Sequence, residues 1–325
     1  MRSRLSLATA LCILVAACGG DDQTAGTTIP DLTGGTTAIP TPGLPFTYTG
    51  PDGVETVVTN AGRIVTVSGD MTEIVFALGL GPNVVGADLS SVYPEEAKAV
   101  SKVGVEFVLV AEAILARAPT VVIGDEDARP LEVIEQIRQA GVPVVIFPRF
   151  MGLGAPAEKI RAVAEVLGIG EAGEALALRV QAEIDEVAAR AAEVSERPRV
   201  ALIYQASADT TLLLGPNSVM DGLFEAVGAI DVSPAAGADP YVPLTAEALA
   251  AGDPEVIVTA ERGLGRYLGG IEGLLELPGV AQTTAGRERR ILVYEDLFLL
   301  GLGPRTGQLL SRLFADLHPE AAAQS

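Results

Sequence analysis

The residue best placed for covalent chemistry in this sequence is Cys18, at the end of an apolar run. Arg2 and Arg4 precede the run, which closes with Val-Ala-Ala-Cys-Gly-Gly over positions 15–20. A basic start, a short apolar middle and small residues before a boundary are typical of a secretory signal. The closing series is typical of a bacterial lipobox, whose cysteine is lipidated and becomes the mature N-terminus. We therefore expect residues 1–17 to be a signal peptide and Cys18 to carry a lipid anchor.

Other reactive side chains are scarce. Cys12 lies within the expected signal peptide, so the mature chain would hold neither a free thiol nor a disulfide. The single histidine, His318, lies near the C-terminus, which excludes most enzymes that use a histidine base, triad or zinc ligand. The one Gly-x-Gly-x-x-Gly series, at 168–173, follows a helical stretch instead of a strand and lacks the context of a dinucleotide site. We expect a protein that is not an enzyme.

The charge of the chain limits its partners. Acidic residues number 42 against 22 Lys and Arg, a formal net charge of −20. Such a surface repels phosphate backbones, so we expect no nucleic-acid partner. Acids this numerous form chance pairs, and no pair of carboxylates stands out as a catalytic site.

One pattern of chemistry-bearing residues occurs twice, at residues 111–123 and 246–258. Both segments begin Ala-Glu-Ala, and Glu112 and Glu247 each lie seven residues before a Pro. We interpret each segment as a short helix that leads into a buried strand. Acids at a helix start complement its dipole, and helix–Pro–strand joints look alike, so a purely structural interpretation stays open. The shared start favours two related lobes.

Strands and helices alternate around these segments. Strands are predicted at 64–67, 84–87, 120–123 and 142–146, and helices at 71–78 and 131–140. Ser68 and Asp70 are placed to cap the first of these helices. Strands that alternate with helices imply a parallel sheet with helices on both faces, so the fold class is α/β.

A single long helix is predicted between the two halves of the chain. Residues 171–194 are rich in Ala, Glu, Leu and Arg, and Pro198 follows them. At 1.5 Å per residue such a helix is about 36 Å long, roughly the diameter of a domain. A second strand–helix series begins at 200–204. We therefore expect two Rossmann-like lobes joined by this helix, with a ligand cleft between them.

These elements predict how the chain is divided. Residues 18–60 are rich in Gly, Thr, Pro and Asp, which predicts a lipid-anchored flexible tether, with Tyr48 as a loop residue. The N-terminal lobe is expected at 61–170, the linking helix at 171–195 and the C-terminal lobe at 196–325.

The folded part resembles the substrate-binding lipoproteins of ABC importers for haem, corrinoids and siderophores. The resemblance covers about residues 62–318 and is carried by the segments 63–73, 91–97, 102–104 and 301–305. Its Gly-Asp-Met-Thr-Glu and Val-Tyr-Pro series are most similar to the haem-binding receptors. The resemblance implies a receptor on the outer face of the cytoplasmic membrane that captures haem between the lobes. Its partners would be an ABC permease and the associated ATPase subunits.

The resemblance implies iron ligands at Tyr93 and Tyr241, which match family positions that face the cleft. A phenolate is a hard anionic oxygen suited to ferric iron, and it binds only when deprotonated. Some haem-binding relatives have a Tyr-x-Arg whose Arg helps the phenolate, and Pro243 takes that place here. A second ligand is often a His before the long helix, where this chain has Met151. Each of these side chains also has an interpretation as a packing residue.

The resemblance gives further residues a role. Phe150 is placed either to stack on the macrocycle or to fill the core. Arg149 and Arg305 are placed either to pair with the two propionates of haem or to form surface ion pairs. Glu112 and Glu247 match the acids that dock each lobe onto Arg pockets of the permease, as a two-fold partner would require. Haem is here the transported ligand, and no catalytic cofactor is expected.

Three alternatives stay open. A corrinoid such as vitamin B12, or a ferric siderophore, would suit a receptor of the same class. An extracytoplasmic enzyme with the same two lobes is a second alternative, although the chain has no Walker A, Gly-x-Ser-x-Gly or Cys-x-x-Cys series. An adhesion or structural lipoprotein is the third, and it would need neither the paired glutamates nor the repeated lobe.

Overall fold

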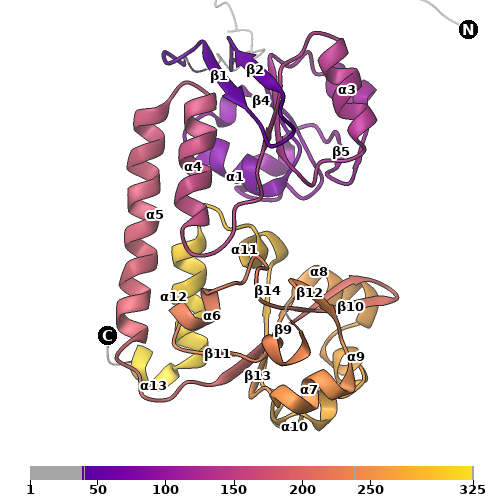
Figure 1. Cartoon of the computed structure of the whole chain (residues 1–325), viewed down its shortest axis with the longest axis vertical. Coiled ribbons are helices and arrows are strands. Elements are labelled where there is room, and N and C mark those ends of the chain that lie inside the picture. Colours follow the sequence, from indigo (N-terminus) through magenta and orange to yellow (C-terminus); the bar gives the residue numbers. More distant parts are fainter. Residues whose placement is uncertain (1–38, 40, 238, 324–325) are drawn as a thin grey trace, which may run out of the picture. The chain divides into compact units, whose positions relative to one another are not determined.

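Two β-sheets form two lobes, and one long helix joins them (Figure 1). The computed structural model describes residue 39, residues 41–237 and residues 239–323. All of these belong to one compact unit. Residues 1–17, the expected signal peptide, and Cys18 lie outside the described residues. Within the described part, no helix has the length and apolar character needed to cross a bilayer.

The N-terminal lobe is built on a parallel sheet of four strands in the order β4-β3-β7-β8. Its strands are β3 (Ile64–Thr66), β4 (Val84–Ala87), β7 (Val121–Asp125) and β8 (Val144–Phe147). Its helices are α1 (Gly69–Ala77), α2 (Ala111–Leu115), α3 (Leu131–Gln139) and α4 (Ala155–Val166), and a hairpin joins β5 (Gly104–Val105) to β6 (Val108–Leu109). The strands are buried along nearly their whole length, as a sheet covered on both faces requires.

The C-terminal lobe has a sheet in the order β12-β10-β9-β13-β14, with β11 beside β9. Its strands are β9 (Arg199–Ser207), β10 (Thr210–Leu214), β11 (Ile230–Asp231), β12 (Tyr241–Pro243), β13 (Val256–Ala260) and β14 (Ile291–Tyr294). Its helices are α6 (Leu223–Ala226), α7 (Ala246–Gly252), α8 (Glu261–Gly263), α9 (Ile271–Leu275), α10 (Thr284–Glu288), α11 (Asp296–Leu300), α12 (Thr306–Leu317) and α13 (Pro319–Ala322). The α/β class and the two lobes are confirmed.

This second sheet is mixed, whereas the sequence predicts a parallel one. Strands β9, β13 and β14 are parallel, but β10 runs antiparallel to both β9 and β12. The cause is the short connection of β9 to β10, because a two-residue link allows only an antiparallel neighbour.

The linking helix α5 (Gly170–Ala191) is the longest helix in the described residues. It packs against α4 of the first lobe and α12 of the second, as Figure 1 also shows. Its buried side chains include Leu176, Val180, Ile184 and Val187. This three- or four-residue spacing places one apolar stripe toward both neighbours.

The segment expected to be a flexible tether is in part a hairpin. Strand β1 (Phe46–Thr49) pairs antiparallel with β2 (Glu55–Val58). The ring of Tyr48, interpreted above as a loop residue, lies with its centroid 5.2 Å from that of Phe147 in β8. The tether prediction is therefore wrong for this hairpin, because a few alternating apolar residues suffice to pack a strand on an existing lobe. The average composition of the segment hides that alternation. Residues 18–38 lie outside the described residues.

The start of α1 also differs from the prediction. Ser68 makes no capping bond to the backbone, and its hydroxyl donates instead to Asp70 Oδ1 at 2.6 Å. Lys159 Nζ of α4 donates to Asp70 Oδ2 at 2.6 Å and to the carbonyl oxygen of Gly301 at 3.0 Å. Burial acts to raise the pKa of Asp70, but the Lys159 ammonium holds it below its usual range. The helix start is thus tied to α4 and to the C-terminal lobe.

Candidate functional site

Tyr93 lies in the loop after β4, and its ring faces an arginine of the other lobe. This loop leaves the carboxyl end of a parallel strand, the edge at which open α/β sheets bind ligands. The guanidinium carbon of Arg305 is 3.7 Å from the centroid of the Tyr93 ring, a cation–π distance. The same carbon is 5.1 Å from the ring centroid of Phe298 in α11. Tyr93 remains 41 % exposed, so a ligand can reach it.

Arg305 is held by a buried carboxylate. Its Nε and Nη2 donate to Glu73 Oε1 and Oε2 of α1 at 2.9 and 2.7 Å, a bidentate pair between the lobes. The side chains of Arg305 and Glu73 are only 14 % and 4 % exposed. Burial raises the pKa of Glu73, and the Arg305 guanidinium opposes that change. The structure therefore gives Arg305 a fixed position behind Tyr93, already paired with an internal acid.

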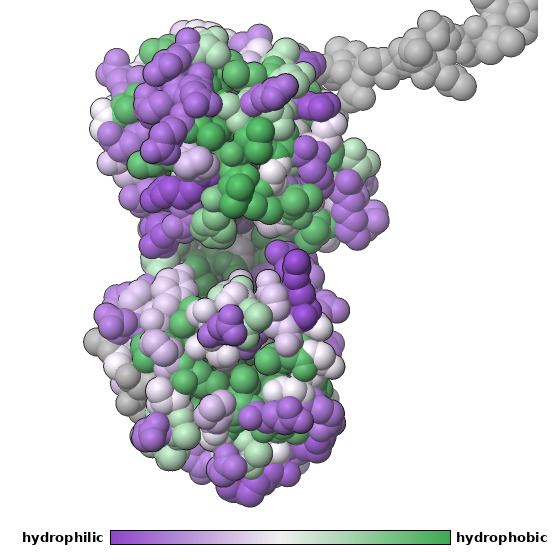
Figure 2. All heavy atoms as spheres, turned by 90° about the vertical axis from the view of Figure 1, so that its right-hand side faces the viewer, coloured by the Kyte–Doolittle hydropathy of each residue, from purple (hydrophilic) through white to green (hydrophobic). Residues whose placement is uncertain are grey.

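A cavity of about 810 Å³ opens beside this pair, between the lobes. The N-terminal lobe contributes Tyr93 and Lys98, and the C-terminal lobe contributes Arg262, Phe298 and Arg305. Four acids also line it: Glu95, Glu261, Glu295 and Asp296. Figure 2 shows the hollow between the two lobes, with hydrophobic residues of the N-terminal lobe next to it. The cavity thus combines aromatic surface with cations from both lobes.

A second cavity, of about 750 Å³, shares Tyr93 and Arg305 with the first. It reaches Phe76 of α1, Arg179 of α5 and Gln308 of α12. The stacked pair is therefore a common wall of both cavities, and moving it would change the two together.

Tyr241 and Arg149 lie near one another, away from this wall. Tyr241 is on β12 at the edge of the C-terminal sheet, opposite Leu214, and is 42 % exposed. Burial raises the pKa of Tyr241, and the positive charge of Arg149 acts in the opposite direction. Arg149, which follows β8, is itself held by Asp127 through its guanidinium. Neither residue lines either cavity. Arg149 thus brings a cation toward Tyr241 from the other lobe.

Phe150 and Met151 occupy the loop between β8 and α4. Phe150 is half-buried and packs against the main hydrophobic core, so the structure gives it a packing contact. Met151 is also half-buried. Neither lines the two cavities. The described residues contain no cluster of three His, Cys, Asp or Glu able to hold a metal ion. Among the residues expected to hold iron, Tyr93, Tyr241 and Met151 each offer one donor atom.

Two buried carboxyls lie at the carboxyl edge of the N-terminal sheet. Glu106 lies between β5 and β6, and Asp125 ends β7. Burial and the nearby charge of Asp125 raise the pKa of Glu106 to about 10. Burial and the charge of Asp70 raise the pKa of Asp125 to about 6. Both changes favour the neutral carboxyl, so this edge carries less negative charge than its acids suggest.

Glu112 and Glu247 occupy equivalent places in the two lobes. Each is the second residue of a short helix, α2 or α7, and each is exposed. The opposite face of each helix is buried through Ile114 or Leu249. Their side chains therefore point away from the core of each lobe.

The sequence analysis missed Lys98 and Arg262 in the cavity wall. Arg262 is the second residue after β13, at the carboxyl end of a parallel strand, and its backbone N–H donates to Asp296 Oδ2 at 2.8 Å. A search for cations at the carboxyl ends of predicted strands would have found Arg262. Lys98 lies in a short turn of 3-10 helix, Glu95–Ala99, that carries no comparable signal.

Known proteins resemble this chain over most of its length. The periplasmic heme-binding protein RhuT from Roseiflexus sp. RS-1, solved in apo form, is 44 % identical and superimposes with a TM-score of 0.76. The match covers 81 % of this chain and 100 % of RhuT. The ABC transporter substrate-binding lipoprotein YvrC of Bacillus subtilis is 24 % identical, over 79 % of this chain and 80 % of YvrC.

A vitamin B12-binding protein is also similar, though less extensively. That of Vibrio campbellii is 24 % identical over 63 % of this chain and 72 % of its own length. The periplasmic binding protein family model matches residues 64–296, which include both sheets, α5 and most of the cavity wall. By this match and by its two lobes, the chain belongs to the periplasmic binding protein family.

Proposed function

We propose that this protein is the extracytoplasmic receptor of an ABC importer and that it captures haem in the cavity between its lobes. The observation that carries the proposal is Tyr93, stacked on Arg305 in the wall of a cavity of about 810 Å³. The 44 % identity to a heme-binding protein supports the same ligand. Haem is the cargo in this proposal, and the protein needs no catalytic cofactor.

The cavity offers contacts both to the macrocycle of haem with its iron and to its propionates. Tyr93 and Phe298 offer aromatic surface to the macrocycle, and a deprotonated Tyr93 offers a hard oxygen to ferric iron. Lys98 and Arg262, one from each lobe, already pair with acids, Lys98 with Glu95 at 2.6 Å and Arg262 with Asp296 at 3.8 Å. Both cations are about half exposed, and exposed pairs of this kind are weak enough for a propionate to take the place of the acid. Arg305 is already bonded to Glu73, so we assign it the support of Tyr93 instead of a propionate.

A corrinoid is the second candidate ligand, because a vitamin B12-binding protein is among the relatives. Corrinoid side chains are mainly neutral amides, which need no cationic partner. A ferric siderophore fills the coordination sphere of its iron and leaves no position for a phenolate. The two cations and the tyrosine therefore favour haem over both.

Optical titration tests the ligand. Haemin added to the purified protein is expected to give a saturable Soret shift at a fixed stoichiometry. Cyanocobalamin and a ferric siderophore are titrated by quenching of the protein's tyrosine fluorescence or by calorimetry. Each is expected to bind at least about tenfold more weakly than haemin, a difference of about 1.4 kcal/mol. If either compound binds more tightly than haemin, the proposal that haem is the ligand is wrong and that compound becomes the proposed ligand.

We propose that Glu112 and Glu247 dock the two lobes onto cationic side chains of the permease. Their equivalent, exposed positions support this role. Replacing both by Ala is expected to reduce haemin uptake strongly while leaving haemin affinity unchanged, because neither lines a cavity. Losing one partner of a desolvated charge pair costs roughly 2–5 kcal/mol of binding. Uptake at the wild-type rate, or a large loss of affinity, would contradict the assignment.

We propose that Cys18 carries the lipid anchor, with residues 1–17 removed. The N-terminal series supports this, as does the similarity to a protein named a lipoprotein. A Cys18→Ala variant is expected to leave the membrane fraction after cell fractionation. Its full retention there would contradict the anchor.

A further inference from the structure

An arginine at the start of a central strand bonds the turn before the neighbouring strand, and this arrangement is found in both lobes. Arg63 directly precedes β3 and Arg199 begins β9, the strand that occupies the corresponding place in the second sheet. The next residues pair in the same register, Ile64 with Val121 and Val200 with Val256. Arg63 therefore lies opposite Thr120, and Arg199 lies opposite Glu255. Each of these two residues directly follows a proline just before the neighbouring strand.

In the N-terminal lobe, the side chain of Arg63 hydrogen-bonds the turn that follows α2. Its Nε donates to the carbonyl oxygen of Ala118 at 2.8 Å, and its Nη2 donates to that of Arg117. Its backbone N–H donates to Thr120 Oγ1 at 3.0 Å. Ala118 has φ of +46°, a left-handed conformation that an L-residue with a side chain adopts at a cost. The arginine thus stabilises a strained turn between helix and strand.

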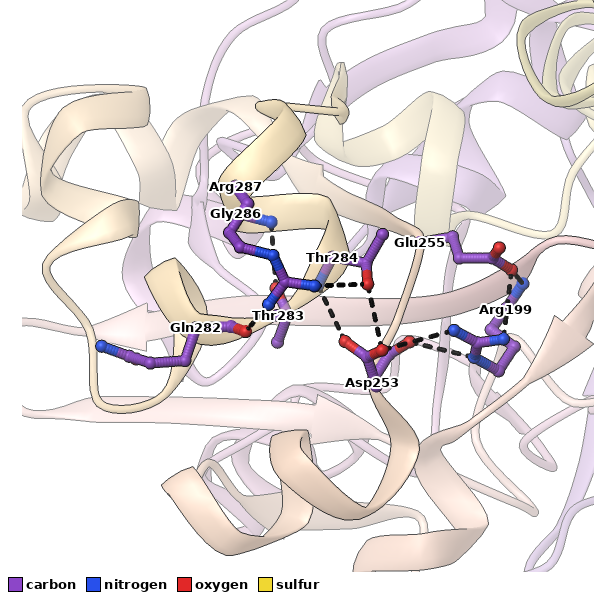
Figure 3. Close-up of polar contacts among 8 residues, drawn as sticks. All are labelled: Arg199, Asp253, Glu255, Gln282, Thr283, Thr284, Gly286 and Arg287. Atoms are coloured by element: carbon purple, nitrogen blue, oxygen red, sulfur yellow. Dashed lines mark hydrogen bonds and ion pairs between the residues drawn. The ribbon is translucent and has the colours of Figure 1, made fainter.

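Arg199 makes the equivalent contacts in the C-terminal lobe (Figure 3). Its Nε donates to the carbonyl oxygen of Asp253 at 3.0 Å, and its backbone N–H donates to Glu255 Oε2 at 2.8 Å. Asp253 again is left-handed, with φ of +35°. The offset is also equal, because Asp253 lies six residues after Glu247 and Ala118 lies six residues after Glu112.

The two units differ in two respects. The Arg199 guanidinium also pairs with Asp253 Oδ2 at 3.4 Å and with Glu255 Oε2 at 3.6 Å, whereas the guanidinium of Arg63 bonds carbonyl oxygens. The Asp253 carboxylate accepts the backbone N–H of Thr284 at 2.8 Å and its hydroxyl at 3.0 Å, which ties the turn to α10 (Figure 3). These bonds also hold the pKa of Asp253 below its usual range. Ala118 has no carboxylate and so cannot make such a tie. The N-terminal unit therefore depends more heavily on its arginine.

The turns bonded by Arg63 and Arg199 set the direction of helices α2 and α7, which precede them in the chain. Helix α2 has five residues and α7 has seven, and helices this short do not hold their direction without contacts at their ends. Ile114 and Leu249 fix one face of each helix on the core. The carbonyl oxygens bonded by Arg63 and Arg199 fix the C-terminal end.

We propose that Arg63 and Arg199 are positioning residues, each of which aims the exposed glutamate of its lobe, Glu112 or Glu247, at the membrane partner. This inference rests on the docking role proposed above. The arginines act through backbone carbonyl oxygens, so their effect is geometric and does not depend on their charge alone. They are distinct from the cavity and have no part in ligand capture.

A double-mutant cycle tests the inference, with the full-length chain as the sole haemin receptor of the cells. The readouts are the initial rate of haemin uptake and, on purified protein, haemin affinity and thermal unfolding. Arg63→Ala is expected to slow uptake at least about tenfold, the size of one displaced charge contact, with affinity unchanged. Arg199→Ala is expected to slow it less, because Thr284 still holds Asp253.

Combined variants separate a positioning role from a general loss of stability. Arg63→Ala with Glu112→Ala is expected to be no slower than Glu112→Ala alone, since both act through one contact. Arg63→Ala with Glu247→Ala is expected to multiply the two effects, since the residues belong to different lobes. Arg161→Ala removes another arginine of the same lobe, bonded to Glu174 at the surface, and is expected to match the wild type.

Two further variants keep the test decisive. Arg63→Lys keeps the charge but loses the Nε bond to Ala118, and it is expected to behave like Arg63→Ala. If Arg63→Ala does not fold, Arg63→Met keeps the aliphatic stem, removes both guanidinium bonds and takes its place in the cycle. Full activity of Arg63→Lys, or multiplied effects of Arg63→Ala and Glu112→Ala, would overturn the inference. If Glu112→Ala and Glu247→Ala leave uptake unchanged, the docking role itself is wrong and the positioning role falls with it.

Discussion

Replacing Tyr93 by Phe is expected to abolish the phenolate-to-iron charge-transfer band of the haemin complex and to weaken haemin binding at least about tenfold, or 1.4 kcal/mol. Phe keeps the ring that stacks on Arg305 and removes only the hydroxyl oxygen. The loss therefore reports ligation of iron and not a collapse of the cavity wall. Absorption spectra and haemin titrations of the purified variant provide the measurement.

Tyr241→Phe is the matched control, because Tyr241 is equally exposed but lies outside the cavity wall. Burial raises the pKa of Tyr241, which disfavours the phenolate, even though Arg149 opposes that change. We expect this variant to keep the charge-transfer band. The opposite result, with the band lost in Tyr241→Phe and kept in Tyr93→Phe, would move the iron to β12. A phenolate band that survives in the double variant would place the ligand at another tyrosine, whereas a wild-type complex that never shows such a band would exclude tyrosine ligation and make Met151 the candidate.

Removing either member of the Glu73–Arg305 pair is expected to lower the free energy of unfolding by about 3 kcal/mol or more. The pair is bidentate and nearly inaccessible to solvent, so truncation of one side chain leaves the other charge buried without its partner. It also joins α1 of one lobe to the residue before α12 of the other. Urea unfolding of Glu73→Ala and Arg305→Ala, followed by circular dichroism, measures the effect.

The control for this pair is Arg161→Ala, which breaks a surface ion pair with Glu174 between α4 and α5. Exposed pairs of this kind contribute less than about 1 kcal/mol. The double variant Glu73→Ala with Arg305→Ala is expected to lose less than the sum of the single losses, because it leaves no unpaired charge. Single variants as stable as Arg161→Ala would show that the buried pair does not hold the lobes.

The main elements of the fold were predictable from local patterns. β-Branched runs located β3, β4, β7 and β8 to within a few residues, and an Ala- and Leu-rich stretch broken only by Gly173 in its first turn located α5. Two features escaped. The hairpin of β1 and β2 is short and lies in a segment of linker composition, and β10 turns back on β9 through a link too brief to stand out.

The candidate site was predictable only in part. Tyr93 could be found because it follows a strand at its carboxyl end, and the paired glutamates because their segments repeat. Phe150 was interpreted either as a ring that stacks on the macrocycle or as a core residue, and its half-buried ring packs against the core. Arg305 was expected to meet a propionate, yet it bonds Glu73, which lies 232 residues away in the chain. Lys98 and Arg262 had no place in the prediction, although both line the cavity.

The amino-acid sequence alone shows which classes of functional site are excluded and that the lobes are of the α/β class. A chain with one histidine and a net charge of −20 excludes whole classes of site, and alternation of apolar residues reports burial within a few positions. Which charges meet is a different matter. Arg305 reaches Glu73, and Arg149 approaches Tyr241, only because α5 and its neighbours bring the two lobes together. That packing sums weak contacts over the entire chain, so no local pattern of residues specifies it.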